Sequence, residues 1–161
     1  MKHFSRNLLL SSTNSSIQLV QIVHKHSTES EVEVLSVSED QLIFSNVRDY
    51  DIKSIFFQIN IPTGPYQPSA FAIMSAQRDT IITIHQHTLK LEPVGELSAL
   101  SLELSRYHLQ MLGPSTNCYL SAKEETCAQC NLVRQPGGAA DIIQNGRPAR
   151  LQFKNISSML A

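Results

Sequence analysis

Short apolar segments with strand character follow one another closely between residues 17 and 91, and turn-forming residues separate them. The clearest segment has a large apolar side chain at every second position: Ile55, Phe57, Ile59 and Ile61. Because successive side chains of a strand point to opposite faces, this spacing places all four on one face. No helical pattern alternates with these segments, which argues against a parallel α/β fold. The pattern therefore predicts a mainly β, antiparallel protein.

Six strands are expected in this part of the chain, at residues 17–26, 31–38, 42–44, 55–61, 70–76 and 80–91. The second and third form a hairpin, because Glu39 and Asp40 make a tight connection between them. Six strands at such short spacing, followed by one helix, favour a closed antiparallel barrel that the helix caps.

The helix is predicted from about Pro93 to Leu112. Its apolar residues recur at steps of three or four, which places them on one face: Leu97, Leu100, Leu104, Tyr107 and Met111. Pro93 suits a first helical turn, and Gly113 with Pro114 suits a helix end. The expected fold class is therefore a six-stranded antiparallel barrel followed by one α-helix.

The chain divides into three expected regions. Residues 1–16 are polar and rich in serine, and we expect a mobile N-terminal segment. Residues 17–113 form the barrel and the helix. Residues 114–161 contain more Gly and Pro and have short strand-like segments at 118–121, 131–134 and 150–155. We interpret this last region as a β-containing C-terminal appendage, or as the start of a truncated second domain.

Charge and hydropathy narrow the function classes. The formal net charge is −1, so no overall field attracts the chain to nucleic acid or to an anionic membrane, although a local basic patch stays open. No apolar run approaches the length of a membrane span, and the N-terminal apolar run is too short for a signal peptide. We therefore expect no nucleic-acid partner, no membrane insertion and a cytoplasmic location.

The order of elements, with an early hairpin and a last strand running into a leucine-rich helix, resembles a PilZ domain over about residues 17–112. PilZ proteins are receptors for cyclic di-GMP in bacterial signalling, and they use an RxxxR segment and a [DN]xSxxG segment. Here Ser36, Ser38 and Gln41 occupy the three marked positions of the second segment, so only Ser38 matches. No arginine pair precedes them. The resemblance thus implies a barrel that has lost its nucleotide motifs and acts through partner binding.

A second, partial match lies near the C-terminus. Asn155 and Ser157 match the start of [DN]xSxxG, but Leu160 replaces the glycine, and Arg147 and Arg150 are three residues apart rather than four. The resemblance implies nucleotide binding at these four matching residues, with cyclic di-GMP as ligand only where a complete second domain follows. A surface strand that ends in polar residues accounts for the same residues without a bound ligand.

A metal site is the alternative. Two His-x-His pairs, His24/His26 and His85/His87, each lie on one face of an expected strand, and Cys118 precedes a Cys127/Cys130 pair. Imidazole and thiolate are common metal ligands, and His108 would complete a four-ligand zinc site with the cysteines. Half-exposed strand histidines and plain thiols are the simpler interpretation.

No motif of a catalytic site is present, so no catalytic residue is assigned and an enzyme is not expected. Leu102 and Leu109 lie off the apolar stripe of the expected helix, and we interpret them as a second contact face for a protein partner or a second protomer. The leading hypothesis is a non-enzymatic regulatory or adaptor protein of PilZ type in cyclic di-GMP signalling, without a cofactor. The alternative is a small metal-binding protein.

Overall fold

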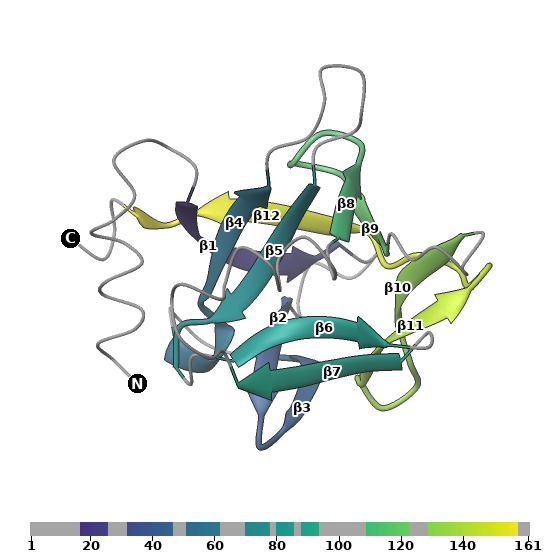
Figure 1. The fold of residues 1–161 in the computed structure, drawn as a ribbon, viewed down its shortest axis with the longest axis horizontal. Coiled ribbons are helices and arrows are strands. Elements are labelled where there is room, and N and C mark those ends of the chain that lie inside the picture. Colours follow the sequence, from purple (N-terminus) through teal and green to yellow (C-terminus); the bar gives the residue numbers. More distant parts are fainter. Residues whose placement is uncertain are drawn as a thin grey trace.

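The computed structural model describes residues 17–25, 32–46, 51–61, 70–77, 80–85, 88–93, 109–122 and 129–157. These residues form antiparallel β-structure throughout, with one short 3-10 helix, η1, at Ile52–Ser54 (Figure 1). The prediction of a mainly β, antiparallel protein is therefore confirmed. Among the described residues, no helix is long and apolar enough to cross a membrane.

The first seven strands are β1 (Ile17–His24), β2 (Glu33–Ser38), β3 (Gln41–Ser45), β4 (Phe56–Ile61), β5 (Ala70–Ser75), β6 (Thr80–His85) and β7 (Thr88–Pro93). The remaining five are β8 (Leu109–Leu112), β9 (Tyr119–Ala122), β10 (Cys130–Arg134), β11 (Ala140–Gln144) and β12 (Leu151–Asn155). The five strands expected before residue 80 thus appear near their predicted positions, and the predicted β2–β3 hairpin is present.

The described strands make one open sheet, not a closed six-stranded barrel, so that part of the prediction is wrong. Neighbouring strands follow the order β11-β10-β9-β8-β5-β4-β1-β2-β3. In addition, β12 pairs with β1, and β6 pairs with both β5 and β7. The barrel prediction failed because β1 pairs with three strands, one of which comes from the far end of the chain.

The predicted sixth strand is two strands. β6 and β7 form an antiparallel hairpin in which His85 lies opposite Thr88 and Thr80 lies opposite Pro93. Alternating β-prone residues on both sides of this reversal made it look like one continuous segment. Pro93 ends β7 instead of starting a helix.

The predicted helix is also wrong at its C-terminal end. Leu109–Leu112 is strand β8, which pairs with β9 and, through Leu109 and Gln110, with β5. A helical spacing of leucines does not exclude a strand when the edge of a neighbouring strand offers backbone partners. Residues 94–108, which include Leu97, Leu100, Leu104 and Tyr107, lie outside the described part of the chain.

Among the described residues, two apolar clusters form the core. The main cluster joins both halves of the chain, because Ile22 and Phe71 share it with Leu120, Leu132 and Leu151. The smaller cluster contains Phe57, Ile59, Ala72, Met74 and Ile81. The two faces of β4 therefore pack on different clusters, with Phe56 in one and Phe57 in the other.

Candidate functional site

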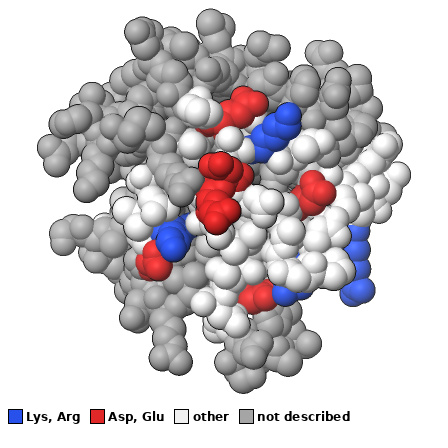
Figure 2. Space-filling view, turned by 90° about the horizontal axis from the view of Figure 1, so that it is seen from below, with Lys and Arg blue, Asp and Glu red and all other residues white. Residues whose placement is uncertain are grey.

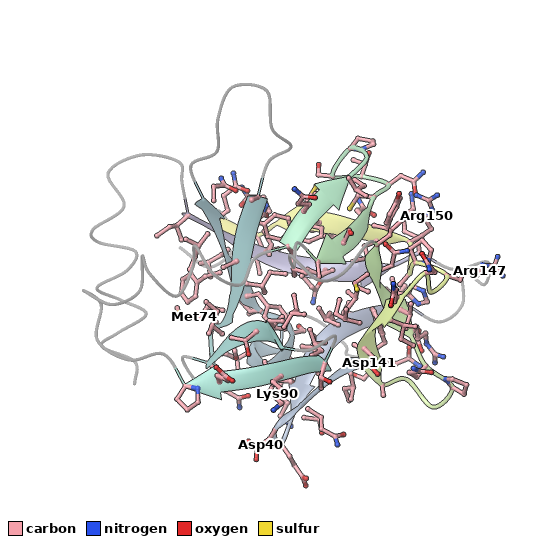
Figure 3. All side chains as sticks on the ribbon, turned by 45° about the vertical axis from the view of Figure 1, so that its right-hand side comes forward. Asp40, Met74, Lys90, Asp141, Arg147 and Arg150 are labelled. Carbon is pink, nitrogen blue, oxygen red and sulfur yellow. The ribbon has the colours of Figure 1, made fainter. Side chains whose placement is uncertain are left out.

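A basic cleft lies at one end of β1, beside β10 and the connection from β11 to β12. We use this name for a hollow of about 430 Å³ lined by His24, Lys25, Arg134, Arg147, Pro148, Ala149 and Arg150. Arg147 and Arg150 lie close together at that end of the molecule (Figure 3). The residues come from three separate parts of the sequence, so the fold alone brings them together.

Hydrogen bonds hold the connection between β11 and β12, which carries Arg147 and Arg150, in place. Asn145 has a positive φ of 55°, and its N–H donates to the carbonyl of Gln129 at 2.8 Å. The side-chain amide of Asn131 donates to the carbonyl of Gly146 at 2.9 Å. The N–H of Ala149 donates to the carbonyl of Leu132 at 2.9 Å. The connection is therefore tied to β10 on both sides of Arg147, which limits the entropy lost when a ligand binds there.

Lys25 and Arg150 are held beside each other. The N–H of Lys25 donates to the carbonyl of Arg150 at 2.7 Å, and Lys25 Nζ donates to the carbonyl of Thr116 at 3.0 Å. The guanidinium of Arg150 lies 5.1 Å from the centre of the Tyr119 ring, which is a cation–π distance. Within the part of the chain that the structure describes, the partners of both cations are thus neutral groups.

Glu33 is the carboxylate at the edge of the cleft. Arg134 donates to it through Nε and Nη2, both at 2.8 Å, and His24 Nδ1 lies 3.0 Å from its Oε1. The hydrogen bond from Arg134 holds the pKa of Glu33 below its usual value, and His24 acts in the same direction, against the opposing effect of burial. The same pairing raises the pKa of Arg134.

The charge balance of the cleft differs from that of the chain. Lys25, Arg134, Arg147 and Arg150 supply four cations, while Glu33 is the carboxylate paired with one of them. The chain as a whole has a net charge of −1. Among the described residues, the positive charge is therefore local, which fits the binding of an anion at this position.

The structure separates the four residues expected to bind a nucleotide. Arg147 and Arg150 line the basic cleft, whereas Asn155 and Ser157 lie at the other end of β12. There Asn155 Oδ1 accepts from the N–H of Ser157 at 3.0 Å, and Ser157 Oγ accepts from the N–H of Leu19 at 3.3 Å. Ile156 between them is buried. Asn155 and Ser157 therefore stabilise the end of the strand beside β1.

The residues proposed as metal ligands, where the structure describes them, lie apart from one another or already have other contacts. His24 contacts Glu33, and Cys118 is a buried free thiol whose Sγ donates to the carbonyl of Leu151 at 3.5 Å. Burial raises the pKa of Cys118 to about 11, despite the opposing charges of Arg150 and Lys25. Cys130 is disulfide-bonded, so its sulfur is not a thiolate ligand in this structure.

Within the described residues, no three metal-ligating side chains come together. His26, His87, His108 and Cys127 lie outside that part of the chain, as does the side chain of His85. Of the two residues expected to form a partner-binding face, likewise only one is described. Leu109 is buried in the main core, and Leu102 lies outside the described residues.

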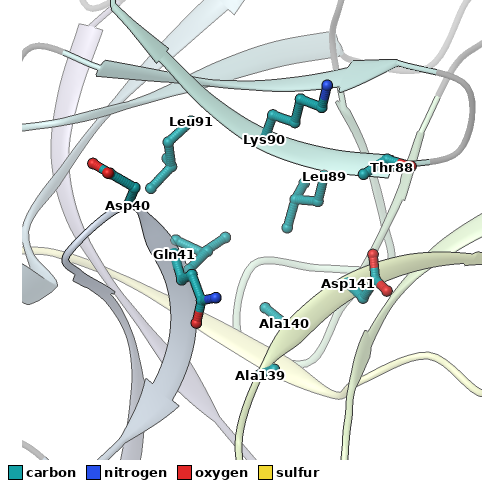
Figure 4. Close-up of a pocket in the computed structure, with 10 residues that line it drawn as sticks. Asp40, Gln41, Thr88, Leu89, Lys90, Leu91, Ala139, Ala140 and Asp141 are labelled. Atoms are coloured by element: carbon teal, nitrogen blue, oxygen red, sulfur yellow. The ribbon is translucent and has the colours of Figure 1, made fainter.

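A second hollow, which we call the edge pocket, lies between β3, β7 and β11 (Figure 4). It has a volume of about 260 Å³, and its lining residues are Asp40, Gln41, Leu42, Thr88, Leu89, Lys90, Leu91, Ala139, Ala140 and Asp141. Sequence reasoning did not identify this pocket, because β7 was not separated from β6 and β11 was not expected at all.

Sequence reasoning also missed Lys25, Glu33 and Arg134 as parts of the basic cleft. Glu33 and Arg134 are 101 residues apart in the sequence, and no motif connects them. No protein-family model matches the chain, and no curated protein matches it either.

Proposed function

We propose that this protein is a non-enzymatic regulatory or adaptor protein that recognises an anionic, phosphate-bearing partner through its basic cleft. The observation that carries the proposal is the position of Arg147 and Arg150 on a connection tied to β10, with Lys25 beside them. Arginine presents several N–H donors in a planar fork that matches phosphate geometry, and lysine adds a point charge.

Cyclic di-GMP is the specific ligand that we propose to test first. The support for it is the placement of Arg147 and Arg150, two of the four residues that the PilZ resemblance marks; the closed barrel on which the resemblance also rested is not formed by the described strands. Asn155 and Ser157 give no support, because their side chains accept from the backbone N–H groups of Ser157 and Leu19. The rival metal-binding hypothesis has less support, since Cys130 is disulfide-bonded and His24 contacts a carboxylate.

The test is calorimetric titration of the full chain with cyclic di-GMP and, separately, with sodium pyrophosphate. We expect pyrophosphate to bind, and we expect the double substitution Arg147→Ala/Arg150→Ala to abolish binding. Binding of cyclic di-GMP as well would support the specific ligand. Lys154→Ala is the matched control, because it removes an exposed cation from β12 outside the cleft.

The outcomes separate the general proposal from the specific ligand. Binding of pyrophosphate alone, lost in the double variant, keeps the anion-binding cleft and removes cyclic di-GMP. Failure of both anions to bind, or equal binding by the double variant, contradicts the proposed function.

A further inference from the structure

Arg134 lines the basic cleft, but its guanidinium is already bonded to protein acceptors. Its Nε and Nη2 atoms donate to Oε1 and Oε2 of Glu33, both at 2.8 Å, and its Nη1 atom donates to the carbonyl of Gln135 at 3.3 Å. Each nitrogen of the guanidinium therefore has an acceptor. Paired hydrogen bonds between arginine and a carboxylate fix the plane of the guanidinium as well as adding energy. An anion that enters the cleft meets Arg134 as one half of an ion pair.

Glu33 is held from a second side by β1. It lies opposite His24 in the β1–β2 pair, and His24 Nδ1 is 3.0 Å from Glu33 Oε1. The His24 ring packs against the Phe44 ring, with 4.9 Å between the ring centroids. The side chain of Glu33 is only 14% exposed. Because the carboxylate is largely buried and bonded to both Arg134 and His24, we expect it to stay beside Arg134 when the cleft is occupied.

The other cations of the cleft have different surroundings. Among the described residues, Lys25 Nζ donates to a backbone carbonyl, and the guanidinium of Arg150 lies over the Tyr119 ring. Neither of these partners has a negative formal charge. The described contacts therefore leave Lys25 and Arg150 as full cations, whereas Glu33 offsets the charge of Arg134.

The described part of the face seen in Figure 2 shows no continuous basic surface. Lysine and arginine side chains are mixed with acidic ones there, and acidic side chains gather near its middle. The chain as a whole has a net charge of −1. Among the described residues, the attraction for an anion therefore arises within the cleft, where a single carboxylate changes a large part of the local charge.

Glu33 repels an anion that binds near Arg134. The Coulomb energy between two groups is proportional to the product of their charges, so this repulsion grows with the charge of the ligand. The attraction by Arg134 grows in the same way, and the two effects offset each other. The preference of the cleft for a highly charged anion therefore depends mainly on Lys25, Arg147 and Arg150.

We propose that Glu33 is a specificity-determining residue of the basic cleft: by pairing with Arg134, it limits the preference of the cleft for highly charged anions. This role rests on the proposed function, because Glu33 acts on the ligand of the same cleft. The property of the ligand that Glu33 controls is its charge. Inorganic phosphate, pyrophosphate and tripolyphosphate form a series of rising charge with the same chemical groups, so their affinities report this control directly.

The experiment is calorimetric titration of the full chain with sodium phosphate, sodium pyrophosphate and sodium tripolyphosphate at pH 7. Glu33→Gln removes the negative charge, and its amide oxygen still accepts a hydrogen bond from Arg134. Arg134→Gln removes the positive charge of the same pair. Both variants lose the same ion pair, but they change the charge of the cleft in opposite directions. Glu92→Gln is the control, because it removes an exposed carboxylate from β7, outside the cleft lining.

We expect Glu33→Gln to bind pyrophosphate about two- to fivefold more tightly than the wild type, which is the range for an exposed charge pair. The gain should be larger for tripolyphosphate and smaller for phosphate. Arg134→Gln should weaken binding, again most for tripolyphosphate. Both effects should shrink when salt is added, because salt screens charges. A purely structural role of the ion pair would move both variants in the same direction, whatever the charge of the ligand.

Three results would overturn the role of Glu33 and leave the proposed function intact. These are wild-type binding of pyrophosphate with no gain in Glu33→Gln, a gain that is equal for the three anions, and a gain of the same size in Glu92→Gln. Absence of binding in both the wild type and Glu33→Gln would contradict the proposed function as well. Binding by Glu33→Gln alone would support the role of Glu33 and contradict the proposed function of the wild type.

Discussion

Glu33 connects β2 to Arg134 and His24, and its depressed pKa makes stability depend on pH. A carboxylate whose folded-state pKa lies below its ordinary value of 4.5 stabilises the fold fully above that value. This contribution is lost as the pH falls below 4.5 and passes through the folded-state pKa. The ion pair is thus a stabilising contact at neutral pH and an ineffective one in strong acid.

We expect Glu33→Gln to lower the free energy of unfolding at pH 7, since the amide cannot form the charged pair with Arg134. The difference from the wild type should shrink in acid. Urea unfolding at pH 7 and at several values below 4.5 measures this. Glu92→Gln, which changes an exposed carboxylate on β7, is the control. A difference that stays constant with pH would contradict the assignment.

Cys118 shows how burial controls the reactivity of a thiol. Its pKa is raised to about 11 because the buried environment disfavours the thiolate, which is the reactive form. We expect the native protein to react with a thiol reagent at pH 8 far more slowly than the urea-unfolded protein. The measurement is the rate of thiol labelling with the Cys130 disulfide left intact. Rapid labelling of the native protein at Cys118 would show that the side chain is accessible.

At the scale of elements, Gly113 allows β8 and β9 to form a hairpin. Its φ is +102°, and a Cβ atom there would lie 2.8 Å from the carbonyl oxygen of Asn117. An L-residue at this position is therefore strained in its backbone and also too close to a backbone atom. Gly137 has a similar φ of +91°, but a Cβ atom there would have no atom within 4 Å.

We expect Gly113→Ala to lower the free energy of unfolding by more than Gly137→Ala does, with the latter costing about 1 kcal/mol. The comparison isolates the close contact with Asn117, because both substitutions place alanine at positive φ. Urea unfolding of the two variants measures the difference. Equal costs would show that the β8–β9 turn relaxes without loss of stability.

The elements also show where sequence patterns mislead. Met111 continues the helical spacing of Leu104 and Tyr107, yet it lies in β8, whose Leu109 and Gln110 pair with β5. β11 was not expected, because its short segment ADIIQ follows two glycines and contains a single pair of adjacent β-branched residues. Its pairing with β10 along five residues makes it a strand.

At the scale of the whole molecule, strand pairing connects the two ends of the described chain. β1 pairs with β12 over five residues, and Ile22 lies opposite Phe153. Ile22 and Leu151 are both fully buried in the main core. Residues on both sides of position 113 therefore contribute to one apolar cluster.

We expect Ile22→Ala and Leu151→Ala each to lower the free energy of unfolding by about 2–5 kcal/mol, as for other buried aliphatic residues. Both should shift the same single unfolding transition, because their side chains share one core. Denaturant unfolding followed by two optical probes measures this, with Val32→Ala as control, since Val32 is 55% exposed. Two separate transitions, each sensitive to only one substitution, would contradict the shared core.

The basic cleft was predictable only in part. Arg147 and Arg150 were candidates from the sequence as a partial match to the family's arginine pair, although they are three residues apart rather than four. Lys25 and Arg134 join them only because Lys25 pairs its backbone with Arg150 and the connection packs on β10. Asn155 and Ser157 matched the start of a second motif, but their side chains accept from the backbone N–H groups of Ser157 and Leu19 at the other end of β12.

The sequence by itself determined the β character and the local hairpin of β2 and β3, because side-chain alternation and turn residues act over a few positions. It also excluded a strong overall charge. Only the tertiary structure decided which strands become neighbours, where Arg134 meets Glu33, and which edges surround the edge pocket. The physical reason is that strand pairing joins backbone groups, which are the same in nearly every residue. The amino-acid sequence of a strand therefore does not identify its partner strand.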